Sequence, residues 1–333
     1  MSRIRFTRFH DGKAFVVGSL SEALEPRGAG GILWVDAEDP TPAELGAIAG
    51  PLGIDPLTVE DCLDDNQVPK MEAFPAYLFL LVNTYRYAET GLTTGEVDFL
   101  LGRDFLVTVR CLRGVHREFY ADLDRRIDRA TAEACRGPDR LLHLLLDFVV
   151  DRKFDELDRI LERVDEAEEA AIDRPQTFRP RDVIRLRRDL LALHRGLFHE
   201  REILLKICRR DSSLIDDSSL YSFRDIYDHL SRFFESIEIC RERITSLMEL
   251  HVSMQNNRLA QASNQIGLVM KRLTVITTIF MPLTFLAGVG GMSEWTMMTG
   301  GEENWPWAYG LLSAGMAVVG IANYLWLKRV KWF

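Results

Sequence analysis

The sequence predicts an α+β membrane protein, in which a cytoplasmic α/β domain and a long helical stalk precede two C-terminal transmembrane helices. Two uncharged runs support this prediction: Leu273 to Ser293, with 21 residues, and Trp305 to Leu327, with 23. Each run is long enough to cross a hydrocarbon core of about 30 Å as a helix that rises about 1.5 Å per residue. Both runs lie near the C-terminus, so we expect the preceding chain to form a water-soluble body.

Composition and charge narrow the possible classes of function. The chain has 333 residues, of which 47% are hydrophobic and 27% charged, and its formal net charge is -9. This acidic balance argues against a generic nucleic-acid binder. No apolar stretch occurs at the N-terminus, so no signal peptide is predicted. The five cysteines form no CxxC pair, which is typical of a reduced compartment and argues against a zinc cluster: Cys62, Cys111, Cys135, Cys208 and Cys240.

Residues 1–112 are predicted to form the cytoplasmic α/β domain. Residues 30–39 have the pattern of a strand, and Thr41 and Pro42 then begin a short helix. Two later segments, 76–87 and 96–110, are rich in aromatic and β-branched residues, which are typical of strands. The second is interrupted by a predicted hairpin turn at 102–104. The pattern leaves the strand order open.

Residues 113–268 are predicted to form the helical stalk. Residues 141–172 have the pattern of a charged amphipathic helix, and residues 181–210 are expected to form its antiparallel partner. From Tyr221 onward no proline occurs before Pro282, so one helix is expected to continue from the body into the first membrane span. A conformational change in the body could then reach the bilayer.

Residues 269–333 are predicted to form a transmembrane hairpin, with spans near 271–292 and 305–327 and an outer loop at 293–304. Basic residues flank the two spans on the side of both termini, whereas the loop has none. The positive-inside rule therefore places both termini on the cytoplasmic side of the cell membrane. The basic residues are Lys271, Arg272, Lys328, Arg329 and Lys331; the loop carries the carboxylates of Glu294, Glu302 and Glu303.

One face of the first span is more polar than a lipid anchor requires. Such a face is either a packing face between helices or the wall of a pore. Two helices cannot enclose a pore, so the second interpretation requires several copies around one axis. The loop carboxylates would then attract cations to its mouth. The face, called the stripe below, consists of residues at steps of three or four: Met270, Leu273, Thr277, Met281, Thr284 and Gly288. The opposite face is apolar, with Ile276, Ile279, Phe280, Leu283 and Leu286.

Four segments resemble the CorA family of divalent-cation channels. They are DPLTVEDCLDDNQVPKMEAF at 55–74, EVDFLLGRDFLVTVR at 96–110, FRDIYDHL at 223–230 and VMKRLTVITTIFMPLTFLAGVGGM at 269–292. The segments occur in the family's order, from about residue 54 to the C-terminus. The resemblance implies a homopentameric funnel whose first membrane helix lines the pore. It also implies a divalent cation as substrate and as regulatory ligand between neighbouring cytoplasmic domains, and no other cofactor.

The resemblance also implies roles for single residues. Five residues of the stripe match pore-facing positions: Met270, Leu273, Met281, Thr284 and Gly288. Of these, the two methionines and Leu273 would form apolar constrictions that stop ions by dewetting. Asp225 matches an acidic residue of the regulatory site; the alternative is a surface aspartate paired with a neighbouring side chain. Our gating hypothesis is that metal bound between the cytoplasmic domains holds the pore shut.

The pore mouth departs from the family pattern. Where the family has Gly-Met-Asn, this chain has Gly291, Met292 and Ser293. An asparagine ring offers amide oxygens to the water shell of a cation, and Mg²⁺ gives up that shell reluctantly. A serine hydroxyl is shorter and can donate as well as accept. Mg²⁺ is the expected ion, and Zn²⁺, Co²⁺ or Ni²⁺ is the alternative. Glu294, or Glu302 and Glu303, would replace the acidic residue of the family's outer loop.

No enzyme is predicted. The sequence has no Walker A motif, nucleotide fingerprint or nucleophile–base arrangement, so transport would be passive and driven by the membrane potential. His194 and His199 are five residues apart, which is not the spacing of one helix face, so we expect packing or surface histidines. The partners would be further copies of the chain, the bilayer and metal ions. The rival from another class is a membrane-anchored coiled coil that conducts nothing.

Overall fold

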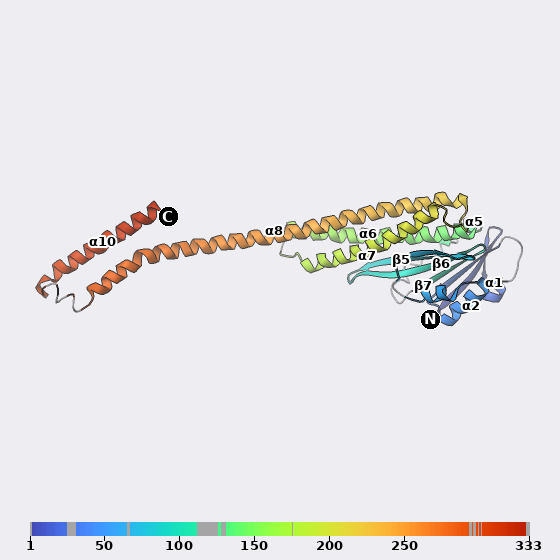
Figure 1. Ribbon diagram of the computed structural model, residues 1–333, viewed down its shortest axis with the longest axis horizontal. Coiled ribbons are helices and arrows are strands. Elements are labelled where there is room, and N and C mark those ends of the chain that lie inside the picture. Colours follow the sequence, from blue (N-terminus) through green and yellow to red (C-terminus); the bar gives the residue numbers. More distant parts are fainter. Residues whose placement is uncertain are drawn as a thin grey trace. The chain divides into compact units, whose positions relative to one another are not determined.

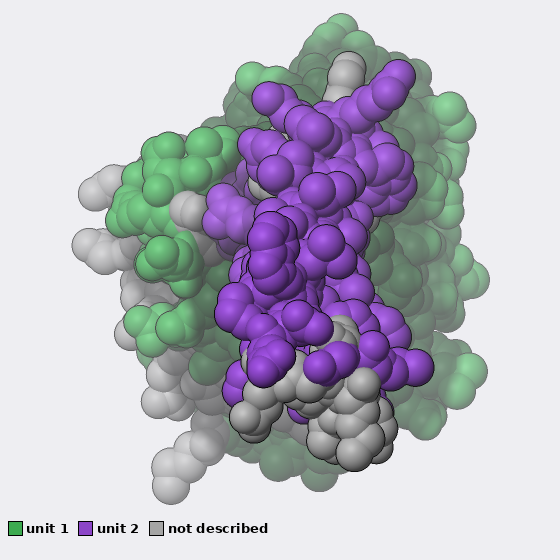
Figure 2. Space-filling view, turned by 90° about the vertical axis from the view of Figure 1, so that its left-hand side faces the viewer, with its two compact units in different colours: residues 1–249 green, residues 250–333 purple. Residues whose placement is uncertain are grey.

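The chain forms two compact units, residues 1–249 and 250–333, and helix α8 (Asp217–Gly290) belongs to both (Figure 1; Figure 2). The finer division predicted at residues 112 and 268 stays a prediction. The computed structural model describes residues 2–24, 31–64, 67–111, 126–127, 131–174, 176–292, 295, 298, 300 and 302–330, with Cys111, Ala132 and Glu302 described by backbone alone.

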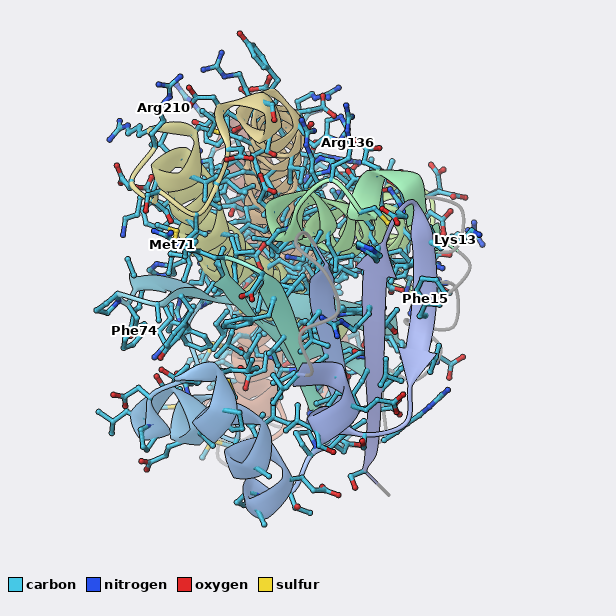
Figure 3. All side chains as sticks on the ribbon, turned by 90° about the vertical axis from the view of Figure 1, so that its right-hand side faces the viewer. Lys13, Phe15, Met71, Phe74, Arg136 and Arg210 are labelled. Atoms are coloured by element: carbon cyan, nitrogen blue, oxygen red, sulfur yellow. The ribbon has the colours of Figure 1, made fainter. Side chains whose placement is uncertain are left out.

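Unit 1 is built around a seven-stranded sheet in the order β2-β1-β3-β7-β6-β5-β4. Strands β3 and β7 are parallel, and every other neighbouring pair is antiparallel. In Figure 3, Lys13 and Phe15 mark β2 at one edge of the sheet and Met71 marks β4 at the other. The strands are β1 (Arg3–His10), β2 (Lys13–Val17), β3 (Ile32–Glu38), β4 (Lys70–Ala73), β5 (Tyr77–Ala88), β6 (Gly91–Gly102) and β7 (Phe105–Cys111).

Helices cover both faces of this sheet (Figure 1). Because strand side chains alternate, β5 sends Leu78 and Leu80 to one core and Phe79 and Leu81 to the other. The first core is closed by the long helices α6, α7 and α8, and the second by the short helices of the N-terminal half. The short helices that close the second core are α1 (Leu20–Leu24), α2 (Pro42–Leu52) and α3 (Pro56–Asp61). The first core contains residues of α6 (Pro138–Ile172) and α7 (Pro180–Cys208), and Ala134 of the short helix α5 (Thr131–Ala134).

Local sequence signals account for several of these elements. Thr41 caps α2 with a capping box, in which its hydroxyl accepts from the Glu44 amide and the Glu44 carboxylate accepts from the Thr41 amide. Gly53 ends this helix in the left-handed conformation, at φ 68°. The predicted strands are confirmed, and the turn predicted at 102–104 joins β6 to β7. Strand β6 begins at Gly91, earlier than predicted, because it pairs with β5 along its whole length.

A polar chain fixes the parallel junction between β3 and β7. The Trp34 indole donates to the Thr108 hydroxyl at 3.2 Å, and that hydroxyl donates to Asp36 Oδ1 at 2.9 Å. The Arg110 guanidinium donates to the same carboxylate oxygen at 2.9 Å. All four side chains are buried. These hydrogen bonds join side chains of β3 to side chains of β7. The network therefore selects the register of two strands that are far apart in sequence.

A buried ion pair holds the long helices on the sheet. Lys153 of α6 donates to Glu200 of α7 at 2.5 Å, and both side chains are at most 2% exposed. The other Glu200 oxygen accepts from the Asn83 backbone amide of β5 at 2.8 Å. Burial lowers the pKa of Lys153, and the Glu200 carboxylate opposes that shift. Gly196 lets α7 approach, since a Cβ there would lie 1.9 Å from the Tyr85 hydroxyl.

The predicted helices of the stalk and membrane hairpin are confirmed. Helix α6 ends at Ile172, α7 begins at Pro180, and α8 continues without interruption past Pro282 to Gly290. A short 3-10 helix, η2 (Glu302–Asn304), precedes α10 (Trp305–Arg329). Helices α8 and α10 each contain a stretch long and apolar enough to cross a membrane. Only 11% and 6% of those stretches are buried, so their apolar surface needs a cover beyond the chain itself.

The carboxyl group of Asp98 is buried, and the nearby Lys70 ammonium offsets only part of the cost of that burial. Asp98 of β6 is 1% exposed, and its Oδ1 atom has no hydrogen-bond partner among the described residues. Burial raises the pKa of Asp98 well above its ordinary value, and the nearby Glu96 carboxylate raises it further, against a hydrogen bond with Cys62. A neutral carboxyl group is therefore favoured in the folded state.

We predict that Asp98→Asn makes the protein more thermostable at neutral pH. The folded state holds the Asp98 proton more tightly than the unfolded state, so stability is lost as pH rises from the ordinary carboxyl pKa toward the raised one. The amide cannot ionise, so this loss should vanish. The measurement is the melting temperature of the purified full chain in detergent between acid and neutral pH. Asp211→Asn, at an exposed position, is the control; equal pH profiles for Asp98→Asn and the parent would contradict the assignment.

Candidate functional site

The candidate site is the stripe on the membrane-spanning part of α8. All six of its members are exposed in the single chain, and Met270, Leu273 and Met281 are 62%, 63% and 71% exposed. The helix presents them on one side because their steps of three and four residues keep them in line at 3.6 residues per turn. The stripe thus has no partner within the described residues of its own chain.

Helix α10 packs on the other side of α8. The Tyr309 hydroxyl donates to the Gly290 carbonyl at 3.4 Å, and a Cβ on Gly290 would lie 2.2 Å from Leu312. Leu283 lies 3.8 Å from the Cβ position of Gly320. At 3.6 residues per turn, Leu283 and Gly290 lie opposite the stripe. Of the predicted apolar face, Ile279, Leu283 and Leu286 are partly buried, whereas Ile276 and Phe280 are exposed.

The stripe combines apolar side chains with hydrogen-bond acceptors. The Thr277 hydroxyl donates to the Leu273 carbonyl at 2.9 Å, and the Thr284 hydroxyl donates to the Phe280 carbonyl at 2.8 Å. Because each proton is already used within the helix, the remaining lone pairs of these oxygens can only accept. Gly288 has no atom within 4 Å of its Cβ position, so the backbone is open there. This face can accept hydrogen bonds from the water shell of a cation.

The predicted mouth lies only partly within the described residues. Gly291 and Met292 continue the end of α8, with the Gly291 amide donating to the Ala287 carbonyl at 3.0 Å, and Met292 is exposed. Ser293 and Glu294 lie outside the described residues, as does the side chain of Glu302. Glu303 is exposed in η2, close in sequence to the start of α10. The roles predicted for these residues stay predictions.

Asp225 lies on α8 in unit 1, away from the stripe in sequence. Its side chain is 69% exposed, and its Oδ1 atom is 3.9 Å from His229 Nε2. Within the described ranges, no group of three or more His, Cys, Asp or Glu side chains could hold a metal ion. A site at Asp225 therefore needs ligands from elsewhere, and a neighbouring copy could supply them.

The two histidines considered as a metal pair contact other groups. His194 Nε2 lies 2.5 Å from Glu238, and its ring is 4.6 Å from that of Phe234, centroid to centroid. His199 makes an edge contact with the neighbouring Phe198 ring. Both interactions are those of packing and surface side chains, as expected from their spacing.

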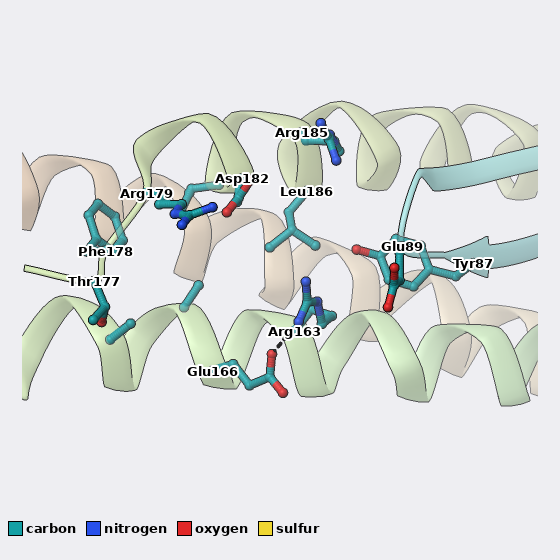
Figure 4. Close-up of a pocket in the computed structure, with 13 residues that line it drawn as sticks. Tyr87, Glu89, Arg163, Glu166, Thr177, Phe178, Arg179, Asp182, Arg185 and Leu186 are labelled. Carbon is teal, nitrogen blue, oxygen red and sulfur yellow. Dashed lines mark hydrogen bonds and ion pairs between the residues drawn. The ribbon is translucent and has the colours of Figure 1, made fainter. Parts of the chain in front are cut away.

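A cleft in unit 1 was missed by the sequence reasoning. It has a cavity volume of about 160 Å³ and lies between the tip of the β5–β6 hairpin, the end of α6 and the start of α7. Figure 4 shows Arg163 and Leu186 pointing into it from two helices, with Arg163 paired to Glu166 at 2.7 Å. Its walls come from three separate segments, so no local motif could have indicated it. Three guanidiniums and three carboxylates balance in its lining, which favours no ligand charge.

The chain is similar to known proteins in family, sequence and structure. The family described as CorA-like Mg²⁺ transporter protein matches residues 29–329. The cobalt/magnesium transport protein CorA of Thermotoga maritima is 31% identical over 284 residues, which are 84% of this chain and 77% of that protein. The protein of the same description from Methanocaldococcus jannaschii is 23% identical over 306 residues, 90% of this chain and 91% of that one.

One solved structure matches the fold of nearly the whole chain. The complete structure of the CorA magnesium transporter from Methanocaldococcus jannaschii matches with a TM-score of 0.69 and 20% identity, covering 99% of this chain and 98% of that one. The match includes both the soluble part and the two C-terminal apolar helices, so the predicted fold class is confirmed.

We predict that Gly290→Val destabilises the α8–α10 hairpin. The added side chain would overlap Leu312, and overpacking of this kind costs about 1–3 kcal/mol. Leu312→Ala in the same chain should restore part of the loss, because it removes the atoms that collide. The melting temperature of the full chain in detergent measures both effects. Gly315→Val, at an open position on α10, is the control, and an equal loss for it would show that the collision is not the cause.

Proposed function

The chain belongs to the family of CorA-like Mg²⁺ transporter proteins, and from this premise we propose that it is a passive channel for divalent metal cations. Mg²⁺ is the proposed main ion. At a membrane potential of 100 mV, about 2.3 kcal/mol per elementary charge favours entry, so a doubly charged ion gains about 4.6 kcal/mol without ATP.

The observation that carries the proposal is the uncovered stripe. In a lipid anchor the exposed side of a span needs only apolar side chains, whereas this side presents Thr277, Thr284 and the open backbone at Gly288. Helix α10 covers the opposite side. This arrangement leaves the polar side free to face a shared axis.

A shared axis requires several copies, and we propose five. Two helices per chain leave the stripe open, whereas a ring of chains would bring the stripes together around water. Each copy of α8 would line the pore and then continue into unit 1, so that the long helices form a funnel. Five is the number of copies that the family resemblance implies, and the M. jannaschii structure, which matches nearly the whole chain, shares the fold from which such a ring would be built.

The pore would alternate apolar and accepting rings. Met270, Leu273 and Met281 would form constrictions that exclude water when narrow. Thr277 and Thr284 would accept hydrogen bonds from the waters around the ion, because their protons are used within the helix. Reading the hydrated ion suits Mg²⁺, which loses its water shell reluctantly.

The mouth and the orientation follow from the sequence. Gly291, Met292 and Ser293 would form the outer ring, and Glu294, Glu302 and Glu303 would attract cations to it. Lys271 and Arg272 lie at the start of the first span, and Lys328 and Arg329 end α10. The positive-inside rule then places both termini on the cytoplasmic side of the cell membrane.

A second candidate keeps the architecture and changes the ion. Ser293 stands where the resemblance leads one to expect an asparagine, and its hydroxyl can donate as well as accept. Such a ring would favour the hydrated Mg²⁺ ion less strongly. Zn²⁺, Co²⁺ or Ni²⁺ is the alternative cargo, and the two CorA relatives named above are both described as cobalt/magnesium transport proteins.

Metal would also regulate the channel. Asp225 is exposed on α8 and would meet a carboxylate of the neighbouring copy, so that bound divalent metal bridges them. When internal metal falls, the carboxylates repel each other and the long helices shift. The same helix enters the membrane, which couples the bridge to the pore.

We predict that Gly288→Leu abolishes divalent-cation flux without unfolding the chain. A leucine at an open position collides with nothing in its own chain but would fill the common axis. The assay is Mg²⁺ uptake into liposomes under an inside-negative potential, with Zn²⁺ and Co²⁺ as competitors.

The control for this variant is Gly315→Leu, the same change at an open position of α10, which should keep most of the flux. Normal flux through Gly288→Leu would exclude the stripe as the pore wall. No flux for any ion through the parent chain, at any internal metal concentration, would favour the non-conducting coiled coil. Flux that Zn²⁺ or Co²⁺ outcompetes would favour the alternative cargo.

We predict that Asp225→Lys weakens inhibition by internal Mg²⁺. A lysine places a fixed cation where the metal would bind, so the internal concentration for half-inhibition should rise at least about fivefold. Glu242→Lys is the control, because Glu242 is also exposed on α8. An unchanged inhibition curve for Asp225→Lys would remove this residue from the regulatory site.

A further inference from the structure

The exposed face of α6 is acidic. Its carboxylates follow one side of the helix, and we call them the acidic flank: Asp155, Asp158, Glu162, Glu166 and Glu169. Arg159 lies among them, with its guanidinium 3.2 Å from Glu156. Three members of the flank are paired with arginines: Asp155 with Arg152, Glu166 with Arg163 and Glu169 with Arg174. Within the described part of the chain no ion pair is found for Asp158 or Glu162. Negative charge is therefore left over at the middle of this flank.

The exposed face of α7 is basic and partly apolar. Four arginines surround three large apolar side chains that recur every seven residues: Arg181, Arg187, Arg188 and Arg195 with Ile184, Leu191 and Phe198, which we call the arginine flank. Ile184 is 56% exposed, so apolar surface remains open to solvent there. Arg188 is 3.7 Å from Asp189, and in the described residues the other three guanidiniums have no ion pair.

The two flanks point away from each other. Helices α6 and α7 contact each other, and both lie on the sheet, as their shared core shows. Both are also covered by α8, through Arg243 on the α6 side and through Glu238, which meets His194, on the α7 side. With the sheet, α8 and the other helix occupying three sides, the free side of each helix lies on an opposite flank of unit 1. One chain therefore cannot pair its own two flanks.

We propose that the arginine flank of one copy docks on the acidic flank of the next copy. Complementary charge within one sequence fits a head-to-tail contact, in which each copy uses one flank toward each neighbour. Such a contact closes into a ring when the rotation between copies divides a full turn. The apolar side chains at the centre of the arginine flank would lose their exposure to water, and the surrounding arginines would set the register.

This inference rests on the proposed homo-oligomeric channel and adds the surface that joins its cytoplasmic units. The charges also explain why assembly would prefer this neighbour: two acidic or two arginine flanks would repel each other. Salt screens exposed charges, so the contact between the two flanks should weaken as the ionic strength rises. An anionic lipid surface is the other occupant that the arginine flank could fit, and the experiment distinguishes it.

The test is a zero-length carbodiimide cross-link in the full chain reconstituted in liposomes. Arg188→Lys with Arg195→Lys provides amines on the arginine flank while keeping the charge. We expect a ladder of covalent oligomers on a denaturing gel, with cross-linked peptides that join α7 lysines to α6 carboxylates. The parent chain has no lysine between Arg181 and Phe198, and it is the first control, which also measures any cross-linking through the exposed Lys206 at the end of α7. Adding Asp158→Asn and Glu162→Asn, which removes the unpaired carboxylates, should reduce the ladder to the parent level.

Every outcome decides between the interpretations. An amine-reactive cross-linker of longer reach first shows that the protein is assembled. If the assembled protein then gives no α6–α7 peptides, the inference is overturned. If no α6–α7 peptides form, and if anionic vesicles but no other vesicles protect the new lysines from amine labelling, the arginine flank would be assigned to lipid. Ion flux without cross-links between the flanks would contradict the proposed contact but not the proposed channel function. Cross-links between the flanks without ion flux would support the contact and contradict the channel function.

Discussion

Two helices can cover each other along only one side, and the organisation of unit 2 depends on that limit. Helix α10 packs against the side of α8 that carries Leu283 and Gly290, so the stripe is left open. Every backbone polar group inside a bilayer must be satisfied within the protein, and a helix satisfies its own groups without a partner strand. The backbone can therefore leave a whole face of side chains free, and this face contains hydroxyl oxygens as well as apolar groups.

Unit 1 depends on a different constraint, which is that a charge buried between the long helices and the sheet needs a partner of opposite charge. Lys153 and Glu200 meet where α6 and α7 rest on β5, and the Glu200 carboxylate also accepts from the strand. Removing one member would leave a buried charge without its partner, at a cost of about 3–5 kcal/mol. The pair therefore holds two helices in one position on the sheet. Their charged faces consequently point outward on opposite sides, where further copies can reach them.

The two units share one helix, which connects their chemistry. Helix α8 carries Asp225 and Arg243 in unit 1, then the stripe in unit 2. A continuous helix transmits rotation and translation because its hydrogen-bonded backbone resists local change. In the proposed assembly, helix α8 would couple metal binding beside Asp225 to the width of the pore. The contact between flanks would be part of the same coupled arrangement.

The sequence by itself determined the features that depend on neighbouring residues: the Thr41 cap, the turn at 102–104, the uncharged spans and the membership of the stripe. Each follows from spacing along the chain, which propensity and hydropathy describe. The tertiary structure alone decided the parallel pairing of β3 with β7, the burial of Asp98 and the side of α8 that α10 covers. These depend on contacts between residues far apart in sequence, such as Lys153 with Glu200, and many partners of similar polarity would satisfy the same local pattern.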